Sequence, residues 1–373
     1  MYTAYDRREY VRREHLPFLR TRFLIYDEYL ITRRPASFLE FSRLLPHEFE
    51  DLYQRIARTL EHYPTHAGPI TGRQRLMLFL RFVARGGTFT SCALDACCGK
   101  STVSCLVAEV TEAIIRELHD FAFPPLTRDM MEETARLTQE RFDYPRGVAF
   151  MDGKHIAIDK PPHSGSMFWN YKNFYSIILL AIADGNYRVL AYDVGAAGRA
   201  GDAGVYRSSP IKQRWLDSHD DIFPPTRFLG NVGPVQYHIL VDGGFGQDFR
   251  LVRPYRELEC DTPDKRRFNE KFCGARRLVE STFGILAQRF RILMQPMHMS
   301  PKRASRIVIA LLILHNILPR RQDVLQGVQR YPHEDGQLHS LQRTAPVRGP
   351  NAAKLARERI TMYYVDKYGH AVD

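Results

Sequence analysis

The stretch GVAFMDGKHIAI (147–158) decides the fold, because it is the first of several stretches with a sequence pattern typical of β-strands. The stretches SIILLAIAD (176–184) and YRVLAYDVG (187–195) follow it, and QYHILVDGGFG (236–246) comes after a polar, Gly-rich segment. Each is short, apolar and bounded by residues that favour turns, which is typical of β-strands. Helix-like sequence lies between the third and fourth predicted strands and again after the fourth. The pattern predicts an α/β unit.

The sequence on both sides of these strands predicts helices. Amphipathic patterns cover residues 1–60, 265–295 and 301–318. A stretch rich in Pro, Gly and His at 62–72 favours a boundary. We predict four regions, which are an N-terminal helical region (1–62), a second helical region (63–146), the α/β unit (147–318) and a polar C-terminal tail (319–373) with room for a short helix near 350–362.

The charge of the chain is strongly positive. Among 373 residues, 53 Lys and Arg against 42 Asp and Glu give +11, while 44% apolar and 25% charged residues are ordinary for a globular protein and exclude a disordered, collagen-like or coiled-coil chain. The excess indicates a polyanionic partner, either nucleic acid or an acidic membrane surface. The longest apolar runs, at 177–183 and 307–314, have seven and eight residues. A spanning helix needs ~20, so we expect no membrane segment.

The N-terminus and the cysteines both favour an intracellular protein. The first residues are charged and lack an apolar core, so we expect no secretory signal. The spacing of the six cysteines matches no zinc motif, and the simplest interpretation is buried, reduced cysteine in a cytosolic or nuclear protein. They stand at positions 92, 97, 98, 105, 260 and 273.

Four acidic residues lie in or next to the predicted strands and the long helix, at positions suitable for binding metal ions. Asp152 lies inside the first predicted strand, Asp242 ends the fourth, Asp202 follows the Gly-rich segment, and Glu280 lies on the long helix. Ligands commonly bind at the carboxyl ends of strands in open α/β sheets. Hydrolysis of a phosphodiester can use two Mg²⁺ ions ~4 Å apart, held by carboxylates from separate elements. The four acids therefore predict a shared metal site.

Each acid alone also has an ordinary structural interpretation. Asp152 with its following glycine is typical of a hairpin turn, and Asp242 with two glycines is typical of a loop. Asp202 is suitable as a helix cap, and Glu280 stands four residues after an arginine, as in a solvated ion pair. Spacing alone leaves both interpretations open.

Three stretches in order resemble the DDE nuclease domain of PIF/Harbinger transposases and their domesticated nuclease relatives. They are FMDGKHIAI (150–158), LVDGGFG (240–246) and FNEKFCGARRLVESTFGILAQRFRIL (268–293). The segment GAAGRAGDAGVYRSS (195–209) and the Leu-His-Asn at 314–316 also match the family pattern.

Two positions depart from that pattern, since Lys154 replaces the usual Thr and Phe245 the usual Tyr. Neither change removes a candidate ligand, but Lys154 brings a positive charge beside the site. His155 and His315 fit better as hydrogen-bonded structural residues than as ligands, because Mg²⁺ favours oxygen over imidazole.

The resemblance implies an RNase H-like fold and a metal-dependent DNA endonuclease or transposase that hydrolyses phosphodiester bonds. The implied metal ligands are Asp152, Asp202, Asp242 and Glu280, with Asp152, Asp242 and Glu280 as the catalytic triad. The implied cofactor is a divalent cation, Mg²⁺ before Mn²⁺. The alternative is a domesticated transposase that binds DNA or a protein partner but cuts weakly or not at all.

DNA contact is expected from two places. Residues 86–116 resemble the helix-turn-helix of the same transposases, with the alternative of a plain helical hairpin, and the second place is the segment 253–306. That segment has 13 basic and six acidic residues, a local +7, although a basic helix is often only a solvated face. The predicted DNA-binding residues are Lys100, Ser101, Thr102 and Ser104 in the first place and Lys265, Arg266, Arg267, Arg276 and Arg277 in the second.

The resemblance also implies a nuclear location and a Myb-like DNA-binding partner protein, with a cytoplasmic location left open. DNA is the expected partner in either location. The sequence predicts neither the DNA target nor the oligomeric state.

Overall fold

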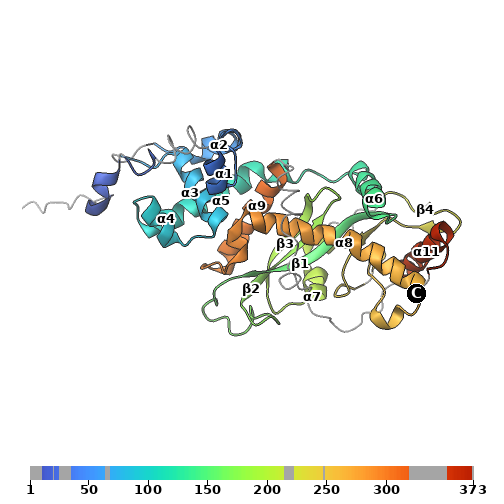
Figure 1. Cartoon of the computed structure of the whole chain (residues 1–373). Helices are drawn as coiled ribbons and strands as arrows, with labels where there is room; N and C mark the ends of the chain where they lie inside the picture. Colours follow the sequence, from blue (N-terminus) through green and yellow to red (C-terminus); the bar gives the residue numbers. More distant parts are fainter. Residues whose placement is uncertain are drawn as a thin grey trace, which may run out of the picture. The chain divides into compact units, whose positions relative to one another are not determined.

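Helices build the N-terminal part of the chain and a mixed sheet with further helices builds the rest (Figure 1). This confirms the predicted α/β class. The computed structural model describes residues 11–19, 21–24, 35–63, 68–213, 222–246, 248–318 and 351–371. The chain divides into two units, one of Met1–Ala122, Ala287–His298 and Arg306–Leu314, the other of Phe123–Leu286, Met299–Ser305 and His315–Asp373.

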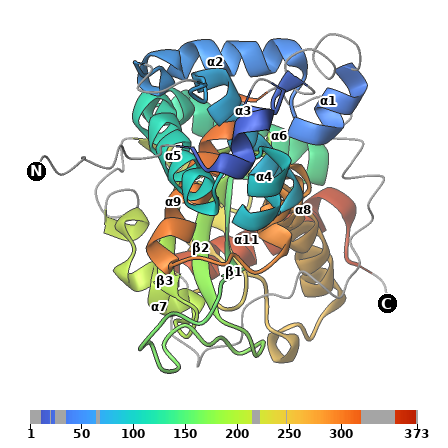
Figure 2. The ribbon, with the colours of Figure 1, turned by 90° about the vertical axis from the view of Figure 1, so that its left-hand side faces the viewer.

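The first unit is helical, and Figure 2 shows α2, α3, α4 and α5 gathered together. Local sequence sets the helix ends: the Thr71 hydroxyl accepts a hydrogen bond from the Gln74 backbone N–H at the start of α3, and Gly86 ends α3 with φ 71°. The elements before the sheet are η1 (Arg13–Phe18), α1 (Pro35–Ser42), α2 (Pro46–Leu60), α3 (Gly72–Arg85), α4 (Phe89–Asp95), α5 (Lys100–Ala122) and, in the second unit, α6 (Arg128–Phe142).

The second unit contains a five-stranded sheet in the order β3-β2-β1-β6-β7. The first three strands pair antiparallel, whereas β6 pairs parallel with both β1 and β7. The four predicted strands are confirmed, and the three two-residue strands β4, β5 and β7 are additions too short for a sequence pattern. The strands are β1 (Gly147–Ala157), β2 (Ser176–Ala183), β3 (Val189–Ala197), β4 (Arg227–Phe228), β5 (Pro234–Val235), β6 (His238–Leu240) and β7 (Leu251–Val252).

The helix predicted at 265–295 ends earlier than expected. The backbone of Phe290 leaves the helical region (φ −119°, ψ 85°), and a short 3₁₀ turn follows it. The later elements are α7 (Asp202–Ser208), η5 (Glu257–Glu259), α8 (Pro263–Arg289), η6 (Arg291–Met294), α9 (Pro301–Ile317) and α11 (Asn351–Tyr368).

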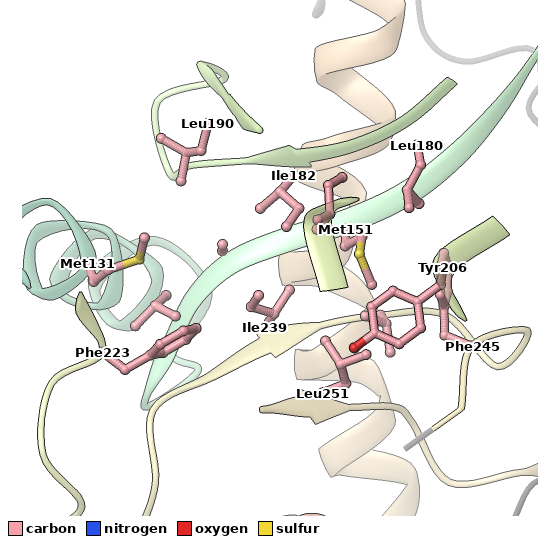
Figure 3. Close-up of a cluster of buried hydrophobic side chains, with 14 of the residues drawn as sticks. Met131, Met151, Leu180, Ile182, Leu190, Tyr206, Phe223, Ile239, Phe245 and Leu251 are labelled. Carbon is pink, nitrogen blue, oxygen red and sulfur yellow. The ribbon is translucent and has the colours of Figure 1, made fainter. Parts of the chain in front are cut away.

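One face of the sheet packs against α6 and α7 (Figure 3). Met151 of β1 lies opposite Ile182 of β2, and both join a buried cluster with Met131 of α6 and Tyr206 of α7. Side chains alternate between the two faces of a strand, so Phe150, Asp152 and Lys154 point to the opposite face. All of β2 is buried, as expected for a strand covered on both sides.

The C-terminal helix is longer and more buried than the predicted polar tail. Helix α11 extends the expected short helix to Tyr368, and its residues Ala353, Ala356, Ile360 and Tyr364 are buried. The Tyr364 hydroxyl donates to the Asp143 backbone carbonyl at 2.7 Å. These residues follow helical i, i+3, i+4 spacing, but alanine and tyrosine make that face hard to recognise from sequence.

Because α11 is packed into the second unit, Ile360→Ala should lower the free energy of unfolding by about 2–5 kcal/mol, the usual cost of truncating a buried aliphatic side chain. Met362 on the same helix has 58% of its surface exposed, and Met362→Ala should cost less than about 0.5 kcal/mol. Urea unfolding of both variants measures the difference. Equal, small effects would show that α11 is not part of the folded core.

Candidate active site

The pairing of β1 with β6 aligns two of the predicted acids. Phe150 lies opposite Leu240 in a parallel register. Two residues further along each chain, Asp152 lies alongside Asp242. Side chains two residues apart point to the same face of a sheet, so both aspartates lie on the face of Phe150 and Leu240. Adjacent strands are ~4.8 Å apart, so the two carboxyl groups are neighbours. Both residues have only 6% of their surface exposed.

Asp152 is not in a turn. The Asp-Gly pair lies inside β1, with Asp152 opposite Ala181 and Gly153 opposite Leu180 of β2. The hairpin interpretation of this dipeptide is therefore wrong, because the strand continues to Ala157.

Helix α8 provides the third acid and a cation. Figure 1 shows α8 running across the sheet. Arg276 and Glu280 stand one turn apart on α8, and their side chains form a hydrogen-bonded ion pair. The Nη1 atom of Arg276 lies 3.6 Å from Oδ2 of Asp152, which is ion-pair distance but too long for a hydrogen bond. Arg276 therefore forms ion pairs with an acid on β1 and with an acid on α8.

The electrostatics show that the three acids are close to one another. Burial raises the pKa of Asp152 to about 7; the charge of Arg276 lowers this pKa, and the charges of Asp242 and Glu280 raise it. Burial also raises the pKa of Asp242, against the opposing effect of Arg276. Burial lowers the pKa of Arg276, but the charges of Asp152, Glu280 and Asp242 outweigh burial and leave it raised. The site is a group of three carboxylates around one guanidinium, in which Asp152 and Asp242 are buried and Glu280 is half-buried.

Backbone donors hold one oxygen of each aspartate. The Gly153 N–H donates to Oδ1 of Asp152 at 2.9 Å, and the Gly244 N–H donates to Oδ1 of Asp242 at 2.8 Å. Hard carboxylate oxygens suit a divalent cation, and three carboxylates with one arginine leave a formal charge of −2. Within the described ranges, however, no group of three or more His, Cys, Asp or Glu side chains is close enough to hold a metal ion. The donor chemistry fits a metal, and Arg276 lies among the donors.

Lys154 lies on the same face of β1 as Asp152, two residues further on. Burial lowers the pKa of Lys154 to about 8, while the charge of Asp152 raises it and that of Lys172 lowers it. Its Nζ lies 5.8 Å from the centre of the Phe283 ring on α8. Where the family pattern has Thr, this chain thus places an amine beside the acids.

The remaining predicted ligand and the two histidines have different positions. Asp202 is the first residue of α7, but its side chain lies outside what the structure describes, so its ligand role stays a prediction. His155 contacts the Ser176 hydroxyl through Nδ1 at 2.8 Å, and His315 contacts the Tyr187 carbonyl through Nε2 at 2.7 Å. Both match the structural role predicted for them.

The predicted DNA-binding residues differ in their exposure. Lys100, Ser101 and Thr102 are exposed in the first turn of α5, Ser104 is half-buried, and Arg266 and Arg277 are exposed on α8. Lys265 pairs with Asp261 at 2.7 Å, and Arg267 donates to the Gly369 carbonyl at 2.7 Å.

The structure gives Arg276 a place that sequence reasoning missed. The sequence predicts that Arg276 binds DNA. In the structure Arg276 lies among the acids, with 15% of its side chain exposed. The i, i+4 spacing to Glu280 was the available signal, but this spacing is equally typical of a solvated pair.

The cysteines follow the prediction in part. All six are free, and Cys92 and Cys98 are buried. Cys105 and Cys273 are exposed, so buried cysteine is the wrong interpretation for these two. None of the described helices is long and apolar enough to cross a membrane.

Comparison with known proteins finds a family match within the sheet-bearing part. Residues 151–316 match the family model described as DDE superfamily endonuclease, and this range includes all four predicted acids. DDE superfamily endonucleases generally use divalent metals. No solved structure matches the chain.

Over most of its length the chain is similar to proteins named Putative nuclease HARBI1. It is 22% identical to the Rattus norvegicus protein over 85% of this chain and 87% of that protein, and 22% identical to the Homo sapiens protein over 84% and 86%. The Xenopus laevis protein is 23% identical over 79% and 78%. These matches confirm the Harbinger-type resemblance that the motifs predicted.

The raised pKa of Asp152 predicts a pH dependence of stability in metal-free protein. Between the ordinary value of 3.8 and about 7, the folded state binds a proton that the unfolded state has lost. Stability therefore falls as pH rises through this window, by ~1.4 kcal/mol for each unit of pKa difference. Asp152→Asn stays neutral and should remove this decline. Urea unfolding with EDTA from pH 4 to 8 measures it.

The exposed Asp366 on α11 offers a matched control for that measurement. Asp366→Asn should keep the pH profile of the wild type. If Asp152→Asn also keeps it, the carboxyl group of Asp152 is not buried as described.

Arg276 and Arg277 are adjacent but should differ strongly on substitution. Arg276→Gln removes the cation among three carboxylates, so in EDTA at pH 8 it should lower the free energy of unfolding by about 3–5 kcal/mol. Added Mn²⁺ should restore part of this loss, because a divalent cation can replace the missing charge. Arg277→Gln, at an exposed position, should change stability by less than about 0.5 kcal/mol. Equal effects of the two variants in EDTA would contradict the central place of Arg276.

Proposed function

We propose that this chain is a divalent-metal-dependent DNA endonuclease of the DDE type, with Asp152, Asp242 and Glu280 as its catalytic acids. The observation that carries the proposal is the group of three carboxylates around Arg276: buried Asp152 on β1, buried Asp242 two residues after the end of the parallel strand β6, and half-buried Glu280 on α8. The sequence match over 151–316 supports the reaction class. The mixed sheet supports the RNase H-like core that the resemblance implies.

The proposed metal is Mg²⁺, with Mn²⁺ as a substitute, held by Asp152, Asp242 and Glu280, and by Asp202 as a fourth ligand. Such a metal activates a water molecule and stabilises the leaving oxygen of a phosphodiester. The backbone N–H groups of Gly153 and Gly244 orient the two aspartates by holding one oxygen of each. Arg276 neutralises part of the charge of the acids and keeps Glu280 turned towards Asp152.

DNA is the proposed substrate. The exposed first turn of α5, with Lys100, Ser101 and Thr102, supports a helix-turn-helix contact, since recognition helices use their N-terminal residues on phosphates and base edges. Arg266 and Arg277 are exposed on the helix that carries Glu280 and suit phosphate contacts. The nuclear location and the Myb-like partner remain proposals that rest on the resemblance alone.

The alternative is a domesticated protein that binds DNA but does not cut it. One observation favours this alternative: Arg276 pairs with the acids, and the described residues contain no group of three ligands at metal-binding spacing. In that case the guanidinium would be the permanent counter-ion of the acids.

Cleavage of plasmid DNA distinguishes the two proposals. Wild-type protein with Mg²⁺ or Mn²⁺ should nick or linearise the plasmid, and EDTA should stop it. Asp152→Ala, Asp242→Ala and Glu280→Ala should each reduce cleavage to background, because each removes a ligand. The exposed Asp366 gives the control, and Asp366→Ala should cleave like wild type.

Two results would contradict the nuclease proposal. Alanine variants that cut as well as wild type would show that the assigned acids are wrong. A wild type that binds DNA in gel shifts but does not cut with either metal would support the domesticated protein.

A further inference from the structure

The segment between β1 and β2, residues 158–175, is an ordered loop that has no obvious role in the core. We call it the β1–β2 loop. It begins where the pair Ala157 and Ser176 closes the two strands, and the Ile158 N–H donates to the Tyr175 carbonyl at 2.9 Å. In Figure 2 this segment, in green, extends beyond the ends of β1 and β2. Asp152 lies five residues before Ala157 on the same strand, ~17 Å at 3.3 Å per residue.

The side chain of Asn170 holds the loop in shape. Asn170 has 2% of its surface exposed, and its Oδ1 accepts hydrogen bonds from the backbone N–H groups of Lys172 (2.9 Å) and Phe174 (3.3 Å). Its Nδ2 donates to the Ser176 hydroxyl at 2.9 Å, and the Ser176 N–H donates to the Phe168 carbonyl at 2.9 Å. These hydrogen bonds give the loop a defined conformation, which fixes where its side chains lie.

Apolar side chains are exposed on this fixed loop. Met167 has 57% and Trp169 40% of its surface exposed. Trp169 contacts the edge of Tyr175, with ring centres 4.9 Å apart. A large indole that contacts the Tyr175 ring and has 40% of its surface exposed offers a stacking platform, and bases stack on such rings whatever their sequence.

Cations surround this aromatic surface. Lys160 is exposed, with its Nζ 5.9 Å from the centre of the Tyr175 ring, and the Nζ of Lys172 lies 5.6 Å from the centre of the Tyr171 ring. Arg199 from the end of β3 is exposed and joins the loop, since its backbone N–H donates to the Met167 carbonyl at 3.2 Å. The segment itself has Lys160 and Lys172 against one acid, Asp159, which leaves +1, and Arg199 adds a cation from outside the segment.

We propose that the β1–β2 loop binds an unpaired DNA strand that continues along β1 to the acids, with a base stacked on Trp169 and phosphates on Lys160, Lys172 and Arg199. The combination of an exposed aromatic side chain with cations at its margin is the chemistry that recognises single-stranded nucleic acid. Lys154 stands between Asp152 and the loop along β1, on the same face of the strand as Asp152. The location next to a cleavage site rests on the proposed nuclease function, whereas strand binding itself does not.

Fluorescence of Trp169 tests the contact directly. The chain has two tryptophans, and Trp215→Phe leaves Trp169 as the single reporter. Titration of this full-length variant with a 20-nucleotide oligothymidylate should quench the fluorescence, and added salt should reverse the quenching. In the otherwise wild-type chain, Trp169→Ala should weaken oligothymidylate binding about tenfold to a hundredfold, as expected for the loss of one stacked base. Trp169→Phe keeps an aromatic ring and should lie between the two.

Matched controls come from the same unit. Phe228 on β4 is an aromatic residue with 74% of its surface exposed, and Phe228→Ala should bind like wild type. Lys160→Ala and Arg199→Ala should each reduce the slope of log affinity against log salt by about 0.7, whereas Lys302→Ala, at an exposed position in α9, should not. Unchanged affinity in Trp169→Ala and Trp169→Phe, without quenching in the reporter, would overturn the proposal.

Cleavage measurements separate this inference from the proposed function. If wild type binds and quenches but does not cut with Mn²⁺, the loop inference holds and the nuclease proposal fails. If wild type cuts and Trp169→Ala binds and cuts equally well, the loop inference fails and the nuclease proposal holds.

Discussion

A carboxylate in the middle of the central strand of a sheet is costly, and the arrangement around β1 follows from that cost. Asp152 is almost fully buried, and the parallel partner of its strand brings Asp242 to the same face. Two buried carboxylates side by side destabilise the folded state unless a cation or a proton compensates them. Arg276 supplies that cation from α8, and it couples the helix to the sheet at this point. The compensation of the buried carboxylates therefore depends on the position of α8, because α8 carries Arg276.

The strands and the acids could be predicted from the sequence because both have local signatures. The apolar run of β2 and the Asp-Gly-Gly after β6 are visible without any tertiary information. The register between β1 and β6 has no local signature, since these strands are about 90 residues apart in the chain and their pairing is parallel. That register is what converts two separate aspartates into neighbours. The sequence therefore supplied the members of the site, and their alignment required the fold.

For Arg276 and for α11, the sequence pattern leaves open what covers the helix. Whether an i, i+4 ion pair is solvated depends on what covers the helix, and here the face of α8 that carries Arg276 lies against β1. Likewise, alanines and a tyrosine on α11 make a buried face only because a partner surface exists for them. Periodicity shows which residues share a face of a helix, but it does not show what packs on that face.

The internal pairing of cations also changes the meaning of the basic excess. Lys271 lies 3.3 Å from Asp143, Arg276 pairs with Asp152, and Arg306 pairs with Glu112, so acids outside the segment 253–306 compensate at least three of its cations. Charge that could face a phosphate backbone must come from exposed side chains such as Arg277 on α8 and Arg199 beside the β1–β2 loop. A net charge counts every cation equally, whereas a polyanion responds to those at the surface. The charge that matters for binding thus belongs as much to the loop before β2 as to the helix that carries Glu280.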